Sequence, residues 1–253
     1  MLLGGSLVFG QSATPPESSP QSDMVKISGK QFIMGRRPAD GFIFWDEKPW
    51  PPENPLPVEV RAFLLDRREV TNAEYQKCVE KGSCSPSGYA DHPRYNKPDQ
   101  PVVGVTWQQA RDYCRRQNKR LPRETEWELA ARVVCRPAAD GDLRHYAWHA
   151  DNAQGRPQPV GTRAPDLCGA YDLLGNVWEW CGEWYTVPPR NWWKDGPPPE
   201  ENPILFVEGH GRVLRGGAWN TPPESVNPTL RFWRRPDRYS PTVGFRCAMN
   251  AHE

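Results

Sequence analysis

The tract GAYDLLGNVWEWCGEWY, residues 169–185, mixes bulky aromatic side chains with side chains that carry hard oxygen ligands. Asp172, Asn176 and Glu179 supply carboxylate and amide oxygens, and tryptophan or tyrosine residues stand around them. Such oxygens are the ligands that Ca²⁺ takes in proteins, whereas aromatic side chains each bury a large apolar area. The tract therefore predicts cation binding. The alternative is that its carboxylates cap turns and form salt bridges.

A second tract, residues 212–246, is rich in arginine and aromatic residues. It holds seven arginines and no lysine, and its only acids are Glu224 and Asp237. Arginine and aromatic side chains dominate binding hot spots because they bury area at low entropy cost and arginine offers planar donors. We predict a face that binds a protein, peptide or glycan; the alternative is that half of these arginines are internal struts. The predicted ligand residues are Trp219, Asn220, Thr221, Phe232, Trp233, Arg234, Asp237 and Tyr239.

Other catalytic patterns are weak or absent in the sequence. His145 and His149 are four residues apart and could share a helix face as metal ligands. No third ligand follows at suitable spacing, so a pair of ordinary polar histidines is favoured. The sequence has no glycine-rich phosphate loop, no GxSxG elbow and no CxxC pair. Nucleotide, serine-hydrolase and thioredoxin-type chemistry are therefore not indicated.

Composition favours a loop-rich globular domain. The 253 residues can bury a sizeable core, and 29 prolines and 21 glycines interrupt regular elements while 12 tryptophans bury large areas. The formal net charge of +1 gives no field that would steer nucleic acid or anionic lipid. No apolar run is long enough to span a bilayer. We expect no nucleic-acid partner and no membrane span.

The N-terminus and the cysteines favour export. MLLGGSLVFGQSA resembles the apolar region of a secretory signal, although no basic residue precedes Lys26. We assign residues 1–23 to a degenerate signal and flexible lead-in, the alternative being a disordered tail, and residues 24–250 to one domain. Seven cysteines fit an oxidising compartment, so we expect a secreted, periplasmic or cell-surface protein. Cys78 and Cys84 are close enough for a local disulfide just past a helix end.

The elements that position these residues are short. Residues 24–35 alternate about Ser28 and Gly29 and predict a hairpin, and residues 56–70 predict a strand leading into a helix. TNAE, residues 71–74, and TWQQ, residues 106–109, are capping boxes that open helices ending by Gly82 and near Asn118. Residues 120–134 predict a third helix, and strand and loop signals dominate after residue 140. The class is α+β. The predicted buried sides of the last two helices are Trp107, Ala110, Tyr113 and Cys114, and Trp127, Ala130, Ala131 and Val134.

Several blocks stand in one order: LDRREVTNAEY, PVVGVTWQQARDYCRRQNKRLPRETEWELAAR, AYDLLGNVWEWCGEWY, VLRGGAWN and VGFRCA. Together, over roughly residues 24–250, they resemble the formylglycine-generating enzyme, or sulfatase-modifying-factor, family. The resemblance implies a C-type lectin-like fold, with short helices around irregular antiparallel sheets. Because RGG and GFR recur across that family, it also implies that Arg215 and Arg246 are structural.

The resemblance implies one structural calcium site. The family tract that matches residues 171–179 binds calcium through two side chains and two backbone carbonyls. The matching residues are Asp172 and Glu179 for the side chains, and Gly175 and Val177 for the carbonyls. A tight loop whose shell is completed by water suits this hard ion.

The resemblance also implies a disulfide between Cys114 and Cys247. Cys135 and Cys168 could form a further pair, which would leave Cys181 as the odd thiol, but this pairing stays open.

The sequence departs from the family at the catalytic metal. Active members oxidise a substrate cysteine with two copper-binding cysteines that lie a few residues after RGG, and no cysteine occurs here between Cys181 and Cys247. Cu(I) needs such soft ligands, so we expect no copper and favour a non-catalytic ligand-binding domain. The alternatives are a formylglycine-generating oxidase of sulfatase cysteines and a structural subunit of an envelope assembly. The second would dock through residues 187–203, which include Trp192 and Trp193.

One branch of this fold family, the resemblance implies, is diversified by retroelements that mutate adenines between the RGG and GFR blocks. Such mutation does not produce lysine, glutamine, glutamate, methionine or tryptophan. Between Ala218 and Val243 there is no lysine, glutamine or methionine, but there are one glutamate and two tryptophans. This bias is the one expected of a variable protein, although an arginine-rich coding style would also deplete lysine.

Overall fold

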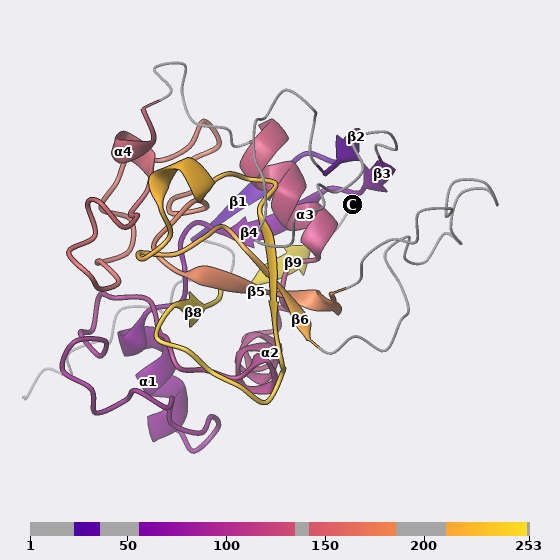
Figure 1. The fold of residues 1–253 in the computed structure, drawn as a ribbon. Helices are drawn as coiled ribbons and strands as arrows, with labels where there is room; N and C mark the ends of the chain where they lie inside the picture. The colour runs from indigo at the N-terminus through magenta and orange to yellow at the C-terminus, as the bar shows by residue number, and fades with distance from the viewer. Residues whose placement is uncertain (1–22, 36–55, 135–141, 186–210, 252–253) are drawn as a thin grey trace, which may run out of the picture.

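Figure 1 shows the chain as a computed structural model that describes residues 23–35, 56–134, 142–185 and 211–251. The described strands form three sheets, with orders β1-β4-β9, β2-β3 and β7-β6-β5-β8. The strands are β1 (Met24–Ile27), β2 (Lys30–Met34), β3 (Leu56–Val60), β4 (Phe63–Asp66), β5 (Trp178–Trp184), β6 (Arg212–Arg215), β7 (Arg231–Arg234), β8 (Val243–Gly244) and β9 (Ala248–Asn250).

Short helices lie around these sheets, as the α+β prediction requires. They are α1 (Asn72–Glu80), α2 (Trp107–Arg116), α3 (Glu124–Glu128) and α4 (Leu143–Tyr146). A π-helical segment, Leu129–Val134, continues α3, and one 3₁₀ turn spans Pro223–Ser225. The docking segment proposed at residues 187–203 and the signal proposed at the N-terminus, apart from Asp23, lie outside the described residues.

Residues 24–34 do not form the predicted hairpin. β1 pairs with β4 and β2 pairs with β3, both antiparallel. Ile27↔Phe63 and Lys30↔Val60 keep one register, so both strands follow the same partner segment. Gly29 does not turn the chain; it lets two backbones approach, because a Cβ atom there would lie 2.6 Å from the Ala62 nitrogen. The alternation correctly predicted strands, but the glycine marks a close contact rather than a turn.

Two helices begin where the capping boxes predict. The Glu74 amide donates to Thr71 Oγ1, and Glu74 Oε2 accepts from the Thr71 amide at 2.8 Å. Thr106 and Gln109 make the same reciprocal pair at the start of α2. Each box satisfies two amides that the first turn of a helix leaves free. The predicted buried sides of α2 and the third helix are confirmed for the residues whose side chains are described, Trp107, Ala110, Tyr113, Cys114, Trp127, Ala130 and Ala131.

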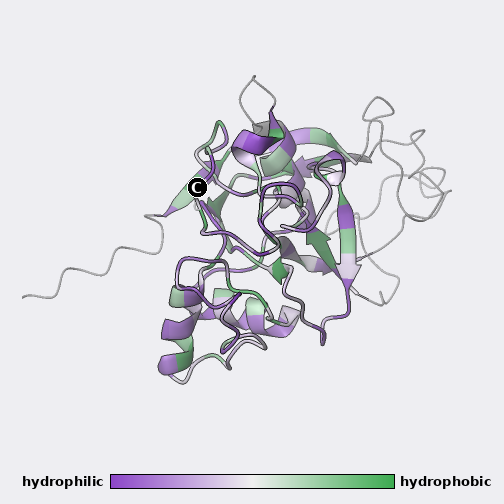
Figure 2. Cartoon of the chain, turned by 60° about the vertical axis from the view of Figure 1, so that its left-hand side comes forward, coloured by the Kyte–Doolittle hydropathy of each residue, from purple (hydrophilic) through white to green (hydrophobic). Residues whose placement is uncertain are grey.

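The four-stranded sheet lies between two cores. Successive strand residues point to opposite faces, so Val213 of β6 packs in the core that contains Trp127, while Leu214 packs in the core that contains Trp180. Figure 2 shows hydrophobic segments on the strands inside the fold and mixed bands on the helices. Within the described part of the chain, no helix has both the length and the apolar character needed to cross a bilayer.

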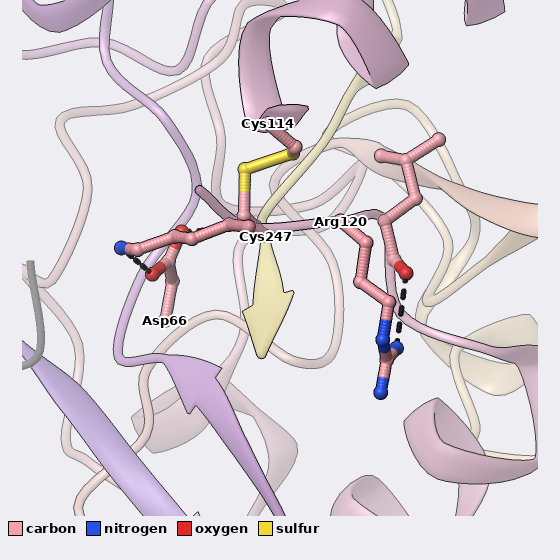
Figure 3. Close-up of a disulfide and its surroundings, with 6 residues drawn as sticks. Asp66, Cys114, Arg120 and Cys247 are labelled. Carbon is pink, nitrogen blue, oxygen red and sulfur yellow. Dashed lines mark hydrogen bonds and ion pairs between the residues drawn. A yellow bond between two sulfur atoms is a disulfide. The ribbon is translucent and has the colours of Figure 1, made fainter. Parts of the chain in front are cut away.

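A disulfide ties α2 to the last strand. Cys114 is joined to Cys247, directly before β9 (Figure 3). Asp66, at the end of β4, accepts from the Cys247 amide at 2.9 Å and pairs with Lys119 at 2.6 Å. Helix, central strand and last strand therefore meet at one cross-link.

The other cysteines differ in state. Cys78 and Cys84 form a disulfide at the end of α1. Cys168 is disulfide-bonded, and Cys181 is a buried free thiol. Cys135 lies outside the described residues.

Candidate functional site

β7, the outer strand of the four-stranded sheet, exposes two aromatic rings. Phe232 is 45% exposed and Trp233 is 42% exposed. The Phe232 ring lies against Trp178, with 5.5 Å between centroids. Trp233 covers Gly211, where a Cβ atom would lie 2.4 Å from the Trp233 ring. Contact on one side holds each ring while its other side remains accessible.

A third ring stands on the loop after β7. Tyr239 is 49% exposed and meets the Tyr89 ring edge-on at 5.7 Å. It also covers Gly88, where a Cβ atom would lie 2.5 Å from the Tyr239 ring. We call Phe232, Trp233 and Tyr239 the aromatic edge. The sequence predicted all three as ligand residues, and all three are accessible.

The other predicted ligand residues differ in how accessible they are. Asn220 is exposed, and Asp237 is exposed but pairs with Arg235 at 3.0 Å. Trp219 is half-buried, and its Nε1 donates to the Pro241 carbonyl at 3.0 Å. Asn220 therefore remains available to a ligand, whereas the polar groups of Trp219 and Asp237 are already paired.

Thr221 is buried, which corrects its prediction as a ligand residue. Its Oγ1 accepts from the Ala218 amide at 2.9 Å. A small hydroxyl that satisfies a turn amide is structural. Arg234, another predicted ligand residue, is half-buried on β7.

Several arginines of this tract are buried struts, as the alternative interpretation predicted. Arg215 is fully buried; its guanidinium contacts Glu128 and lies 3.6 Å from Glu124. Arg231 Nη2 donates to Glu124 Oε2 at 2.9 Å. These ion pairs attach β6 and β7 to α3 and so fix the backbone beneath the aromatic edge.

The predicted calcium loop turns tightly. Asp172 and Asn176 have φ values of 53° and 52°, and Gly175 has 78°. A Cβ atom at Gly175 would lie 2.2 Å from the Trp148 carbonyl oxygen, so only glycine fits there. Val177 is buried immediately after this turn.

Asp172 and Glu179 differ in what they already bind. Asp172 Oδ2 accepts from the Gly161 amide at 2.7 Å, and Oδ1 is buried without a partner among the described residues. Glu179, in contrast, accepts from Arg246 through both oxygens, and from Trp127 Nε1 at 2.9 Å. Asp172 thus fits a cation ligand, whereas the Glu179 carboxylate is occupied by the Arg246 ion pair.

Glu69 is a buried acid that the sequence reasoning missed. Its Oε2 accepts from Asn176 at 3.2 Å, and its Oε1 is buried without a partner among the described residues. Burial and the nearby Asp172 charge raise the pKa of Glu69 well above its usual range. Burial also raises the pKa of Asp172 to about 6. For both carboxylates, burial thus outweighs the partial compensation that Arg246 supplies.

No group of three or more metal-ligating side chains occurs within the part of the chain that the structure describes. His145 is on α4, whereas His149 follows the helix, is buried, and lies 3.2 Å from the Asn152 amide nitrogen. The two histidines therefore do not share a helix face.

The fold is that of formylglycine-generating-enzyme-type, C-type lectin-like domains. PvdO from Pseudomonas aeruginosa aligns with a TM-score of 0.73 and 23% identity, covering 94% of this chain and 100% of that chain. Treponema denticola variable protein 1 aligns with a TM-score of 0.71 and 23% identity, covering 90% and 95%. At this identity the likeness shows the fold alone.

The sequence places the chain in a family. The model of the sulfatase-modifying factor enzyme 1-like domain matches residues 9–251, so the chain belongs to this family. The formylglycine-generating enzyme of Streptomyces coelicolor is 28% identical, covering 93% of this chain and 92% of that protein. A serine/threonine-protein kinase pkn1 of Chlamydia pneumoniae is 29% identical over 94% of this chain. The chain spans 40% of that relative's length.

Proposed function

We propose that this chain is a non-catalytic binding protein that holds a protein, peptide or glycan ligand at the aromatic edge. The observation that carries the proposal is the exposure of Phe232, Trp233 and Tyr239, each between 42% and 49%. Large exposed aromatic side chains favour interaction sites. In the described sheet, β7 also has a neighbour on one side only, so its outer edge offers backbone donors and acceptors.

The support beneath this edge favours a preorganised site. Arg231 of β7 is held by Glu124, and its guanidinium also lies 4.6 Å from the Tyr185 ring centroid. A backbone that is fixed before binding loses less freedom on binding. Variation of the exposed rings would then change the ligand without changing the fold.

The test is ligand capture on peptide and glycan arrays, followed by measurement of Kd for the captured ligand. The Phe232→Ser/Trp233→Ser variant should bind at least tenfold more weakly. Leu167→Ser removes another exposed apolar side chain, 61% exposed, from a separate loop and should bind like the parent protein. Equal binding by the double variant and the parent would place the ligand elsewhere.

We infer that the exposed residues of this tract are diversified between copies of the gene. The composition bias between Ala218 and Val243 supports this inference, as does the accessibility of Asn220, Phe232 and Tyr239 in that stretch. The test is to sequence the flanking DNA for a near-copy of codons 215–247 that differs at adenines. Absence of such a copy would contradict diversification and would indicate a constant binding surface.

We also propose one structural calcium ion beside Asp172. The buried, unpartnered Asp172 Oδ1 and Glu69 Oε1 support it, because a cation would compensate both carboxylates. The Gly175 and Val177 carbonyls of the same turn are the further candidate ligands. The ion would hold the loop in its native conformation; it has no part in a reaction.

Export is a proposal as well. The Cys114–Cys247 and Cys78–Cys84 bonds support it, because such cross-links persist in oxidising compartments. Fractionation of the producing cells, with thiol labelling of each fraction, tests it. Reduced protein in the cytoplasm would contradict it.

A further inference from the structure

A concave pocket of about 370 Å³ lies between α2, the segment that follows it, and the ends of β5 and β6. Among the described residues that line it, arginine is the commonest and Glu183 is the one acid. The arginines are Arg111, Arg115, Arg120, Arg123 and Arg212. None of the lining residues belongs to the predicted calcium loop, residues 171–179.

The helix supplies one wall by its own periodicity. Trp107, Arg111 and Arg115 follow one another at intervals of four residues, so they lie along one side of α2. Trp107 also fixes α2 to β5, because its Nε1 donates to the Cys181 carbonyl at 2.8 Å. Because Trp107 anchors the first turn of α2, the helix side that carries Arg111 and Arg115 is held in place beside the pocket.

Arg212 forms the second wall. Its guanidinium carbon lies 3.7 Å from the Trp107 ring centroid and 3.8 Å from the Trp184 ring centroid. Nη1 donates to the Gly182 carbonyl at 2.8 Å, whereas Nε is buried without a partner among the described residues. Two indole rings thus hold a planar cation in place and remove much of its water. A guanidinium prepared in this way is a good donor to an oxyanion.

The arginines divide into occupied and available groups. Arg120 is bound to Glu126 through both terminal nitrogens at 2.7 Å, and Arg111 pairs with Asp112 at 2.9 Å. Arg115 and Arg123 are exposed, and within the described ranges no carboxylate pairs with either. Asp112 attracts Arg115 electrostatically, but its carboxylate forms its ion pair with Arg111. An anion in the pocket would give both Arg115 and Arg123 a direct partner.

The lining acid weakens this excess of positive charge only in part. Glu183 Oε2 accepts from the Glu124 amide at 2.8 Å. Burial raises the pKa of Glu183 to about 7, so part of the population is neutral at that pH.

We propose that this pocket binds a phosphate or sulfate ester of a larger ligand, with Arg115, Arg123 and the Arg212 edge as donors and the two tryptophans as an apolar wall. The donors come from three separate segments, α2, the start of α3 and β6. Several donors around one concavity suit a group that has three accessible oxygens. The site is additional to the aromatic edge, although the Trp107 amide donates to Pro236 in the loop beyond β7, at 3.2 Å.

The test is isothermal titration of the purified chain with O-phosphoserine, tyrosine O-sulfate, inorganic phosphate and inorganic sulfate, at matched ionic strength. At least one ester should bind saturably and one to one. The Arg115→Ala/Arg123→Ala variant should bind it at least tenfold more weakly. The order of the two esters identifies the source of the oxyanion, and free phosphate or sulfate alone shows whether the ester carrier contributes.

Arg116→Ala/Lys81→Ala is the matched control, because it removes two exposed positive charges that do not line the pocket. It should retain the affinity of the parent protein. Equal weakening of both variants would mean a general charge effect and would overturn the proposal. Absence of binding by all four probes would also overturn it. Neither result would bear on ligand capture at the aromatic edge.

Discussion

Arg246 and Glu179 form an ion pair in which both side chains are buried, with Nη2 2.7 Å from Oε1. Arg246 also donates to the Tyr171 carbonyl at 2.8 Å, and Trp127 donates to the same carboxylate. The pair thus joins the strand β5, the helix α3 and the segment that leads into β9. Glu179 comes from the oxygen-rich tract and Arg246 from the arginine-rich tract, and because they pair in the interior, neither side chain is available to a ligand.

Loss of one partner should be costly. Arg246→Met leaves the Glu179 charge buried and unpaired, and we expect it to reduce the free energy of unfolding by about 3–5 kcal/mol. Urea denaturation at pH 7 measures this. Arg246→Met/Glu179→Gln should lose less than the sum of the single variants. Arg144→Ala, which breaks an exposed pair with Asp142, should leave the unfolding midpoint unchanged.

Calcium should change stability through Asp172. Added Ca²⁺ should raise Tm and a chelator should lower it, since an ion that binds only the folded state stabilises that state. Asp172→Asn should abolish the calcium-dependent shift. In chelator, the same variant should be at least as stable as the parent, because it removes a buried charge. If the Tm of the parent protein is the same with Ca²⁺ and with chelator, the proposed calcium site at Asp172 is wrong.

Glu183 should make stability depend on pH. The native state raises the Glu183 pKa from the usual 4.5 to about 7, so it holds this proton more tightly than the unfolded chain does. Its contribution is fully present below pH 4.5 and is lost as the pH rises to about 7, a difference on the order of 3 kcal/mol. Glu183→Gln should therefore exceed the parent in stability at pH 8 and match it at pH 4. Glu80→Gln, an exposed change, should leave the pH profile as it is.

The two disulfides should differ in their contribution. Cys114–Cys247 spans 133 residues and Cys78–Cys84 spans 6. On chain-entropy grounds the long loop contributes about 5 kcal/mol and the short one about 2 kcal/mol. Paired serine variants, compared by urea denaturation under oxidising conditions, measure both. Equal losses of unfolding free energy in the two variants would contradict the chain-entropy explanation of the long disulfide.

Copper-dependent oxidation should not occur. Residues 218–226 follow the RGG block and contain no cysteine, histidine or methionine. Incubation with copper, oxygen, a reductant and a sulfatase peptide should therefore yield no formylglycine, as measured by mass spectrometry. Formation of the aldehyde would revive the oxidase alternative and would require ligands from other segments.

Local signals in the sequence were sufficient for some features. The capping boxes at Thr71 and Thr106 predicted two helix starts, because a box uses residues only three apart. Phe232, Trp233 and Tyr239 were predicted as ligand residues because aromatic residues interleaved with arginines are typical of binding surfaces, and all three are accessible.

Non-local features escaped the sequence reasoning. Gly29 looks like a turn residue until β3 and β4 supply the opposing backbone. Thr221 has the side chain of a surface residue, but in the fold it is buried and its hydroxyl accepts a hydrogen bond from the Ala218 amide. The Glu69 carboxylate and the arginine pocket depend on segments up to about a hundred residues apart, so no spacing within one segment could reveal them.

The order β1-β4-β9 has a consequence for synthesis. β4, residues Phe63–Asp66, acquires its second neighbour from Ala248–Asn250, and Asp66 receives the Cys247 amide only then. Residue 120 likewise waits for its bridge to residue 248. The three-stranded sheet can form completely only after residues 248–250 have left the ribosome, so β1 and β4 wait for almost 200 later residues before the sheet closes.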